Sequence, residues 1–144
     1  MFKHILLASD GSASAEHAAK KTMDLARIHG ASVTATYVID PYPYVGIGDA
    51  NPMGFQSYMT AAQEAASKAF VHLSELAHAA GVPLEVRLVE DSHVVDGIMA
   101  VADEVAADLI VIGSHGRNAV QKLLLGSVAG KVVAHSTRPV LVVR

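Results

Sequence analysis

The sequence predicts an α/β protein in which an open, parallel sheet of five strands carries helices on both faces. Short apolar runs rich in Val, Ile and Leu alternate along the chain with longer stretches of helical periodicity. Hydrophobic residues make up 51% of the chain and aromatic ones only 5%, so small side chains dominate, which favours helices packed closely on a sheet. With 144 residues, the chain is expected to form a single domain over residues 1–144.

The first strand is expected over residues 5–8, where every residue is apolar, as in a strand covered on both faces. A polar turn ends it, and a helix is expected over about residues 14–29. Either Ser12 or Ser14 can cap the start of this helix, and Gly30 stands where a C-terminal glycine belongs.

A second strand is expected over residues 33–39, followed by a loop over residues 40–56. The density of Pro and Gly in this loop predicts no periodic element there. Such a loop is either a lid over a site or a tolerated insertion. The clearest helix is expected over residues 57–80, where apolar residues recur every three or four positions. A third strand, over residues 84–89, alternates as a half-exposed edge strand does.

The rest of the chain continues the alternation of helix and strand. A helix is expected over about residues 93–106, a fully apolar strand over 109–112, a helix over 127–136 and a terminal strand over 140–143. This alternation favours a parallel sheet with right-handed crossovers. The terminal strand is apolar, so its open edge either pairs with a second copy or is covered by helices of its own chain.

Composition excludes several classes of function. The net charge of -3 provides no basic surface of the kind that nucleic acids require. The chain has no Cys, which excludes disulfides, thiolate catalysis and Cys-based metal sites. No apolar run is long enough for a membrane-spanning helix or a signal peptide, so a soluble, cytoplasmic protein is expected.

Two strand ends carry residues suited to ligand binding. Ligands of open α/β sheets bind at the carboxyl ends of the strands. Here the first strand is followed by Asp10, and the fourth by a segment from Gly113 to Gly116. Gly126 and Ser127 begin the last helix. The whole pattern is Gly, two residues, Gly, nine residues, Gly-Ser.

This pattern points to a nucleotide phosphate. Its first two glycines let the backbone approach a ligand, and they permit positive φ. Its last glycine and Ser127 place free N–H groups at a helix N-terminus, which attracts phosphate. Arg117 adds a cationic fork, and Asp10 suits ribose hydroxyls or holds a metal through water. The simpler alternatives are a tight strand-to-helix turn and plain helix caps.

At these residues the chain resembles the universal stress proteins of the UspA type, over essentially its whole length. The resemblance rests on Asp10-Gly11-Ser12, on residues 107–116, on the ending from Arg138 onward and on the complete glycine motif. It implies the ATP-binding branch of that family, an adenine-nucleotide-alpha-hydrolase-like fold with strand order 3-2-1-4-5, and a homodimer. The strand that would form the dimer contains Val140, Leu141, Val142 and Val143.

The resemblance also implies a ligand and the residues that bind it. The ligand is ATP, or AMP or ADP, and bound triphosphate implies Mg²⁺ or Mn²⁺ held through the phosphates. Asp10 would contact either the ribose or this metal. Because aromatic residues are few, adenine is expected between aliphatic side chains. The nucleotide-binding residues implied are Ala8, Asp10, Val38, Gly113, His115, Gly116, Arg117, Asn118, Gly126, Ser127 and Val128. Many relatives have Pro where Ala8 stands.

The function expected from the glycine motif together with this resemblance is a nucleotide-dependent stress or signalling module that regulates a partner, such as a transporter. The alternative is a slow ATPase or a nucleotidyl or phosphoryl transferase, for which Asp10, His115 and Ser127 are the only candidate groups. The chain has no nucleophile elbow, and residues 126–131 depart from the P-loop pattern. No catalytic residue is therefore expected.

Overall fold

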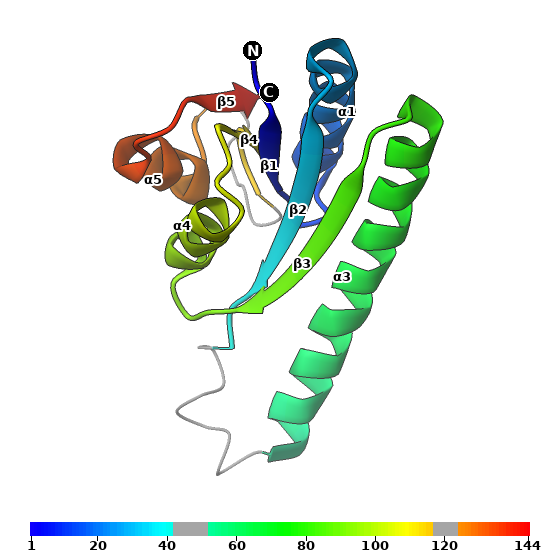
Figure 1. The fold of residues 1–144 in the computed structure, drawn as a ribbon. Helices are drawn as coiled ribbons and strands as arrows, with labels where there is room; N and C mark the ends of the chain where they lie inside the picture. The colour runs from blue at the N-terminus through cyan, green and yellow to red at the C-terminus, as the bar shows by residue number, and fades with distance from the viewer. Residues whose placement is uncertain (42–51, 117–123) are drawn as a thin grey trace.

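A five-stranded parallel sheet in the order β3-β2-β1-β4-β5 forms the centre of the computed structural model, which describes residues 1–41, 52–116 and 124–144 (Figure 1). The strands are β1 (His4–Ala8), β2 (Ser32–Ile39), β3 (Leu84–Glu90), β4 (Leu109–Gly113) and β5 (Val140–Val143). All neighbouring strands pair in parallel. This order confirms the one that the family resemblance implied.

Helices cover both faces of the sheet (Figure 1). They are α1 (Ala13–His29), α3 (Pro52–Ala80), α4 (Val94–Glu104) and α5 (Ser127–His135). Ile5 and Leu7 of β1 belong to the core under α1 and α3, whereas Leu6 and Ala8 belong to the core under α4 and α5. All four side chains are buried, as predicted for a central strand. Among the described residues, no helix combines the length and apolar character needed to cross a membrane.

The ends of α1 select one of the two predicted caps. The Ser12 hydroxyl accepts a hydrogen bond from the Ala15 N–H at 3.1 Å, whereas Ser14 lies inside the helix and is buried. Gly30 ends the helix with a left-handed φ of 67°, as predicted. The cap at Ser12 places the start of α1 directly after the turn that holds Asp10.

The prediction of a loop that reaches residue 56 was wrong, because α3 begins at Pro52. Proline is favoured at the first position of a helix, where its fixed φ suits the helix and its missing N–H has no intrahelical acceptor. The predicted stripe over residues 57–80 is confirmed. Its fully buried members are Met59, Ala66, Leu73 and Ala77. Residues 42–51 lie outside the described residues, so the choice between lid and insertion stays a prediction.

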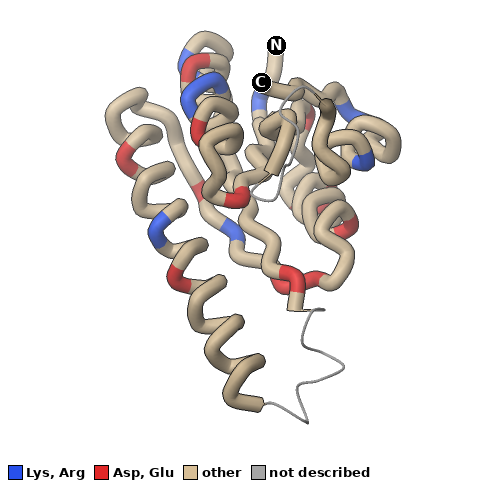
Figure 2. Tube along the Cα trace, turned by 180° about the vertical axis from the view of Figure 1, so that it is seen from behind, with Lys and Arg blue, Asp and Glu red and all other residues tan. Residues whose placement is uncertain are grey.

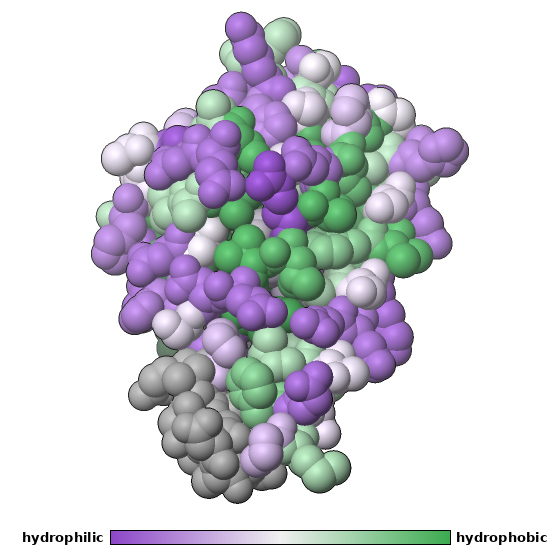
Figure 3. Space-filling model, turned by 60° about the horizontal axis from the view of Figure 1, so that its bottom comes forward, coloured by the Kyte–Doolittle hydropathy of each residue, from purple (hydrophilic) through white to green (hydrophobic). Residues whose placement is uncertain are grey.

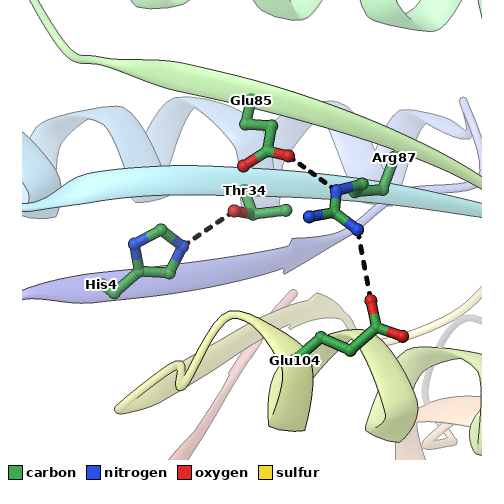
Figure 4. Close-up of polar contacts among 5 residues, drawn as sticks. All are labelled: His4, Thr34, Glu85, Arg87 and Glu104. Atoms are coloured by element: carbon green, nitrogen blue, oxygen red, sulfur yellow. Dashed lines mark hydrogen bonds and ion pairs between the residues drawn. The ribbon is translucent and has the colours of Figure 1, made fainter.

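The two edges of the sheet differ in character. At the β3 edge, Val86 and Leu88 are 40% and 45% exposed, which confirms the predicted half-exposed strand. Arg87 bonds Glu85 at 2.7 Å and Glu104 of α4 at 3.2 Å, so charges line this edge (Figure 4). Charges on an edge strand discourage pairing with another chain. The β5 edge carries only apolar, half-buried residues.

Candidate functional site

A cleft of about 630 Å³ opens at the carboxyl ends of the strands. β1 ends at Ala8, which lies opposite Thr36, whereas β2 continues to Ile39. The residues that line the cleft place it beyond the end of β1, beside this continuing part of β2. Figure 3, in which this end comes forward, shows apolar residues gathered between hydrophilic ones. The size and the apolar lining are typical of small-molecule sites.

Every predicted site residue in the described part of the chain lines this cleft. These residues are Ala8, Asp10, Val38, Gly113, His115, Gly116, Gly126, Ser127 and Val128. Arg117 and Asn118 lie outside the described residues. The residues meet because parallel strands end at one edge of the sheet, and the strand order reverses at β1.

Two helices supply walls of the cleft that the sequence did not indicate. Their lining residues are Tyr58, Ala61, Ala62 and Ala65 of α3 and Val94 and Ile98 of α4. The α3 residues have the spacing of one helix face, and the two α4 residues are one turn apart. Helical periodicity identifies such faces as apolar. The same periodicity does not indicate which part of each face extends beyond the sheet and lines a cleft.

Two motif glycines lie close to other groups of the protein. A Cβ atom at Gly113 would lie 2.5 Å from the Oγ of Ser14, and one at Gly116 would lie 2.8 Å from the Oδ2 of Asp10. Neither glycine has a positive φ, so the conformational freedom expected of them is not used. Their missing side chains instead let the end of β4 approach α1, and the following turn approach Asp10.

Gly126 anchors the start of α5 to that turn. Its N–H donates to the Ser114 carbonyl oxygen at 2.6 Å, and a Cβ there would lie 3.0 Å from the Cα of His115. The prediction that the Gly126 N–H is free for a ligand was therefore wrong. Ser127 and Val128 line the cleft, and N–H groups in the first turn of a helix lack an intrahelical acceptor. A helix N-terminus with positive partial charge thus faces the cleft.

Acidic groups mark this end of the sheet. Asp and Glu positions (red) gather at the lower end of the sheet in Figure 2, where the cleft opens. Asp10 and Asp40 line the cleft, and the Oδ1 of Asp10 accepts the Ser12 N–H at 2.9 Å. His115 also lines it, with its Nδ1 3.1 Å from the Ser114 hydroxyl. Within the described part of the lining, the helix N-terminus is therefore the main attraction for an anion.

The described residues hold no group of three or more His, Asp or Glu side chains that could bind a metal ion. Asp10 and Asp40 do supply carboxylate oxygens, which Mg²⁺ and Mn²⁺ prefer. A cation in this cleft would therefore share its coordination between a carboxylate and the phosphates of a ligand.

Comparisons with known proteins agree over the whole chain. The model of the universal stress protein family matches residues 1–144. A universal stress protein of Thermus aquaticus, named for the QAH/OAS sulfhydrylase 3′ region, is 39% identical over 145 residues, with 100% of both chains covered. The structure of hypothetical protein MJ0577 superposes with a TM-score of 0.87 at 26% identity, over 99% of this chain and 96% of that one. A universal stress protein in complex with cAMP superposes with a TM-score of 0.71 at 26% identity, over 99% and 97%.

Proposed function

The chain belongs to the universal stress protein family, and on that premise we propose that its cleft binds an adenine nucleotide, ATP first among them. The observation that carries the proposal is the convergence of the glycine motif, the α5 N-terminus and Asp10 on one cleft. The similar universal stress protein solved with cAMP supports an adenine nucleotide as the class of ligand.

The proposed orientation follows the chemistry along the cleft. The phosphates lie at Ser127 and Val128, because the N–H groups of a helix N-terminus attract anions. The ribose lies by Asp10, whose carboxylate accepts hydrogen bonds from hydroxyl groups. The base then lies beyond Ala8 and against Val38, where β2 continues past the end of β1. Mg²⁺ or Mn²⁺ would reduce the repulsion between the phosphates and Asp10.

We propose a regulatory role for the bound nucleotide. The turn after β4 and the start of α5 are held together by the bond between Ser114 and Gly126. A ligand in the cleft contacts both segments, so its presence would change the surface that they expose. A partner such as a transporter or a signalling protein would recognise that surface during a stress response.

Calorimetric titration with ATP, ADP and AMP tests the proposal. Ser127→Ala should weaken binding about fivefold, because a net hydrogen bond contributes about 1 kcal/mol. Ser67→Ala removes a hydroxyl from an exposed position of α3 and should leave binding unchanged. A phosphate-release assay on the same samples reports any turnover. No heat with any of the three nucleotides, and no nucleotide carried by the purified protein, would overturn the proposal.

We also propose that two copies pair through β5 to form a homodimer. β5 lies at the edge of the sheet, and its four apolar residues are all half-buried. Val133 of α5, the helix that precedes β5, is also exposed. A second copy would cover this open, uncharged edge.

A further inference from the structure

Tyr58 is the one bulky residue among those that α3 contributes to the described lining of the cleft. The others are Ala61, Ala62 and Ala65. All four residues lie on one face of the helix. The alanines leave room beside the sheet, whereas the tyrosine presents a ring at the N-terminal part of the wall.

The Tyr58 ring is anchored at the end of β2. Its hydroxyl donates to the Asp40 carbonyl oxygen at 2.5 Å. The side chain is half-buried and packs in a cluster with Tyr37, Ile39 and Met59. A ring held in this way loses little conformational freedom when a ligand contacts it, so the contact would add efficiently to affinity.

The opposite wall of the cleft is aliphatic. Val94 and Ile98 of α4 line it, and they pack in the same cluster as Val38. Tyr37 and Ile39 point to the other face of β2 and pack against α3. A flat group that enters beyond the end of β1 would therefore lie between aliphatic side chains of α4 and the α3 wall.

We propose that Tyr58 contacts the base of the bound nucleotide and increases the affinity of the cleft for it. This inference rests on the proposed function, because it uses the orientation of the nucleotide. With the phosphates at α5 and the ribose at Asp10, the base reaches the end of β2, where Asp40 holds the ring. Stacking of a base on an aromatic side chain is tolerant of the base, so the contact adds affinity more than base selectivity.

Two substitutions distinguish the contribution of the Tyr58 ring to affinity from that of its hydroxyl. Tyr58→Ala removes both and should weaken ATP binding about tenfold in calorimetric titration. Tyr58→Phe keeps the ring and loses the bond to Asp40, so its affinity should stay within about threefold of wild type. Val71→Ala shortens an exposed apolar side chain of the same helix and should change nothing. Circular dichroism of each variant establishes that it is folded.

An NMR measurement on the unaltered protein gives a direct readout. Intermolecular NOEs should connect the Tyr58 ring protons, assigned by comparison with Tyr58→Phe, to adenine H2 or H8 of bound ATP. Equal losses in Tyr58→Phe and Tyr58→Ala would overturn the base contact, since the hydroxyl bond alone would then be responsible. Unchanged affinity in Tyr58→Ala, or no such NOE with ATP bound, would overturn it while the proposed function stands. Failure of wild type to bind any adenine nucleotide would reject the proposed function itself.

Discussion

At the scale of single residues, Gly113 connects the candidate site to the packing of the core. A Cβ atom there would lie 2.5 Å from the Oγ of Ser14 and 2.9 Å from its carbonyl carbon. The buried Ser14 hydroxyl has no hydrogen-bond partner among the described residues, so it can rotate away at little cost. The carbonyl group belongs to α1 and cannot move without the helix. The first glycine of the motif is therefore needed for the packing of β4 against α1, apart from any contact with a ligand.

Gly113→Ala should lower the free energy of unfolding by about 1–3 kcal/mol, the usual cost of forcing a methyl group into a packed site. Urea unfolding of the two proteins measures the difference. Gly116→Ala is the matched control, because its Cβ would meet only the movable Asp10 carboxylate, and it should cost less. Adding Ser14→Ala should restore little of the loss at Gly113, because the carbonyl group of residue 14 stays in place. Equal stability of Gly113→Ala and wild type would contradict this packing.

The sequence identified the motif glycines but not the reason that each must be glycine. Spacing alone marked Gly113, Gly116 and Gly126, and all three line the cleft. Which atoms approach each missing side chain depends on the docking of α1 and the turn, which no local pattern encodes. Tyr58 carried no signal either, since a tyrosine in an amphipathic helix reads equally well as core.

At the scale of elements, Asp108 joins the first strand to the fourth. Its carboxylate accepts the N–H of Lys3 at 2.8 Å and that of His4 at 3.1 Å. Its own N–H donates to the His4 carbonyl oxygen at 2.9 Å. Burial acts to raise the pKa of Asp108, but the hydrogen bonds from Lys3 and His4 outweigh it and hold the pKa below its usual value of 3.8. The charged carboxylate therefore stabilises the pairing of β1 with β4.

Asp108→Asn should lower the free energy of unfolding by about 1 kcal/mol at pH 7. Since the pKa is lower in the folded state, the carboxylate's contribution is complete above the unfolded-state value. It is lost as the pH falls through the folded-state value. The difference in the free energy of unfolding between wild type and Asp108→Asn should therefore disappear below about pH 4. Urea titrations at several pH values measure this difference. Asp24→Asn, at an exposed position of α1, should change stability by less than about 0.5 kcal/mol. A difference in the free energy of unfolding that does not change with pH would contradict the role of the Asp108 charge.

Most elements could be predicted from the sequence, because the spacing of apolar residues along the chain distinguishes strands from helices and marks the face of each that is buried. The start of α3 could not, because the effect of a proline depends on its position in the helix. Pro52 and Gly54 counted as breakers, yet Pro52 is the first residue of α3 and Gly54 falls in its first turn. Because Pro and Gly are frequent throughout residues 40–56, these two residues were assigned to the loop and not to the start of the helix.

At the scale of the whole molecule, the topology places the cleft. β1 lies between β2 and β4, so the chain connections diverge on either side of it and leave a crevice at its end. The alternation of strands and helices was enough to predict a site at the strand ends. Its volume depends on β1 stopping at Ala8, opposite Thr36, while β2 continues to Ile39. The apolar runs predicted both strand ends, but they do not reveal the register that places Ala8 opposite Thr36.

The other consequence of this topology is the open edge of β5. The Ser114 N–H bonds the Val143 carbonyl oxygen, and Val142 lies opposite Ile112. In a parallel ladder, successive residues direct their N–H and C=O groups to opposite sides. Because Val143 faces β4, Val142 directs its backbone groups away from it, toward the open edge. In the part of the chain that the structure describes, no other strand pairs with β5 on this side, so these groups can pair with the same strand of a second copy.

Val142→Pro should therefore convert the proposed dimer into monomers. Proline removes the N–H directed to the open edge but no hydrogen bond to β4, a position at which an edge strand tolerates it. The mass of wild type measured by analytical ultracentrifugation should be about twice the chain mass of 15.0 kDa, and that of the variant should equal the chain mass. Val142→Thr keeps the N–H and the β-branched shape, so it should remain dimeric. Circular dichroism identifies variants that have lost the fold. A monomeric wild type at micromolar concentration, or a folded Val142→Pro that stays dimeric, would rule out pairing through β5.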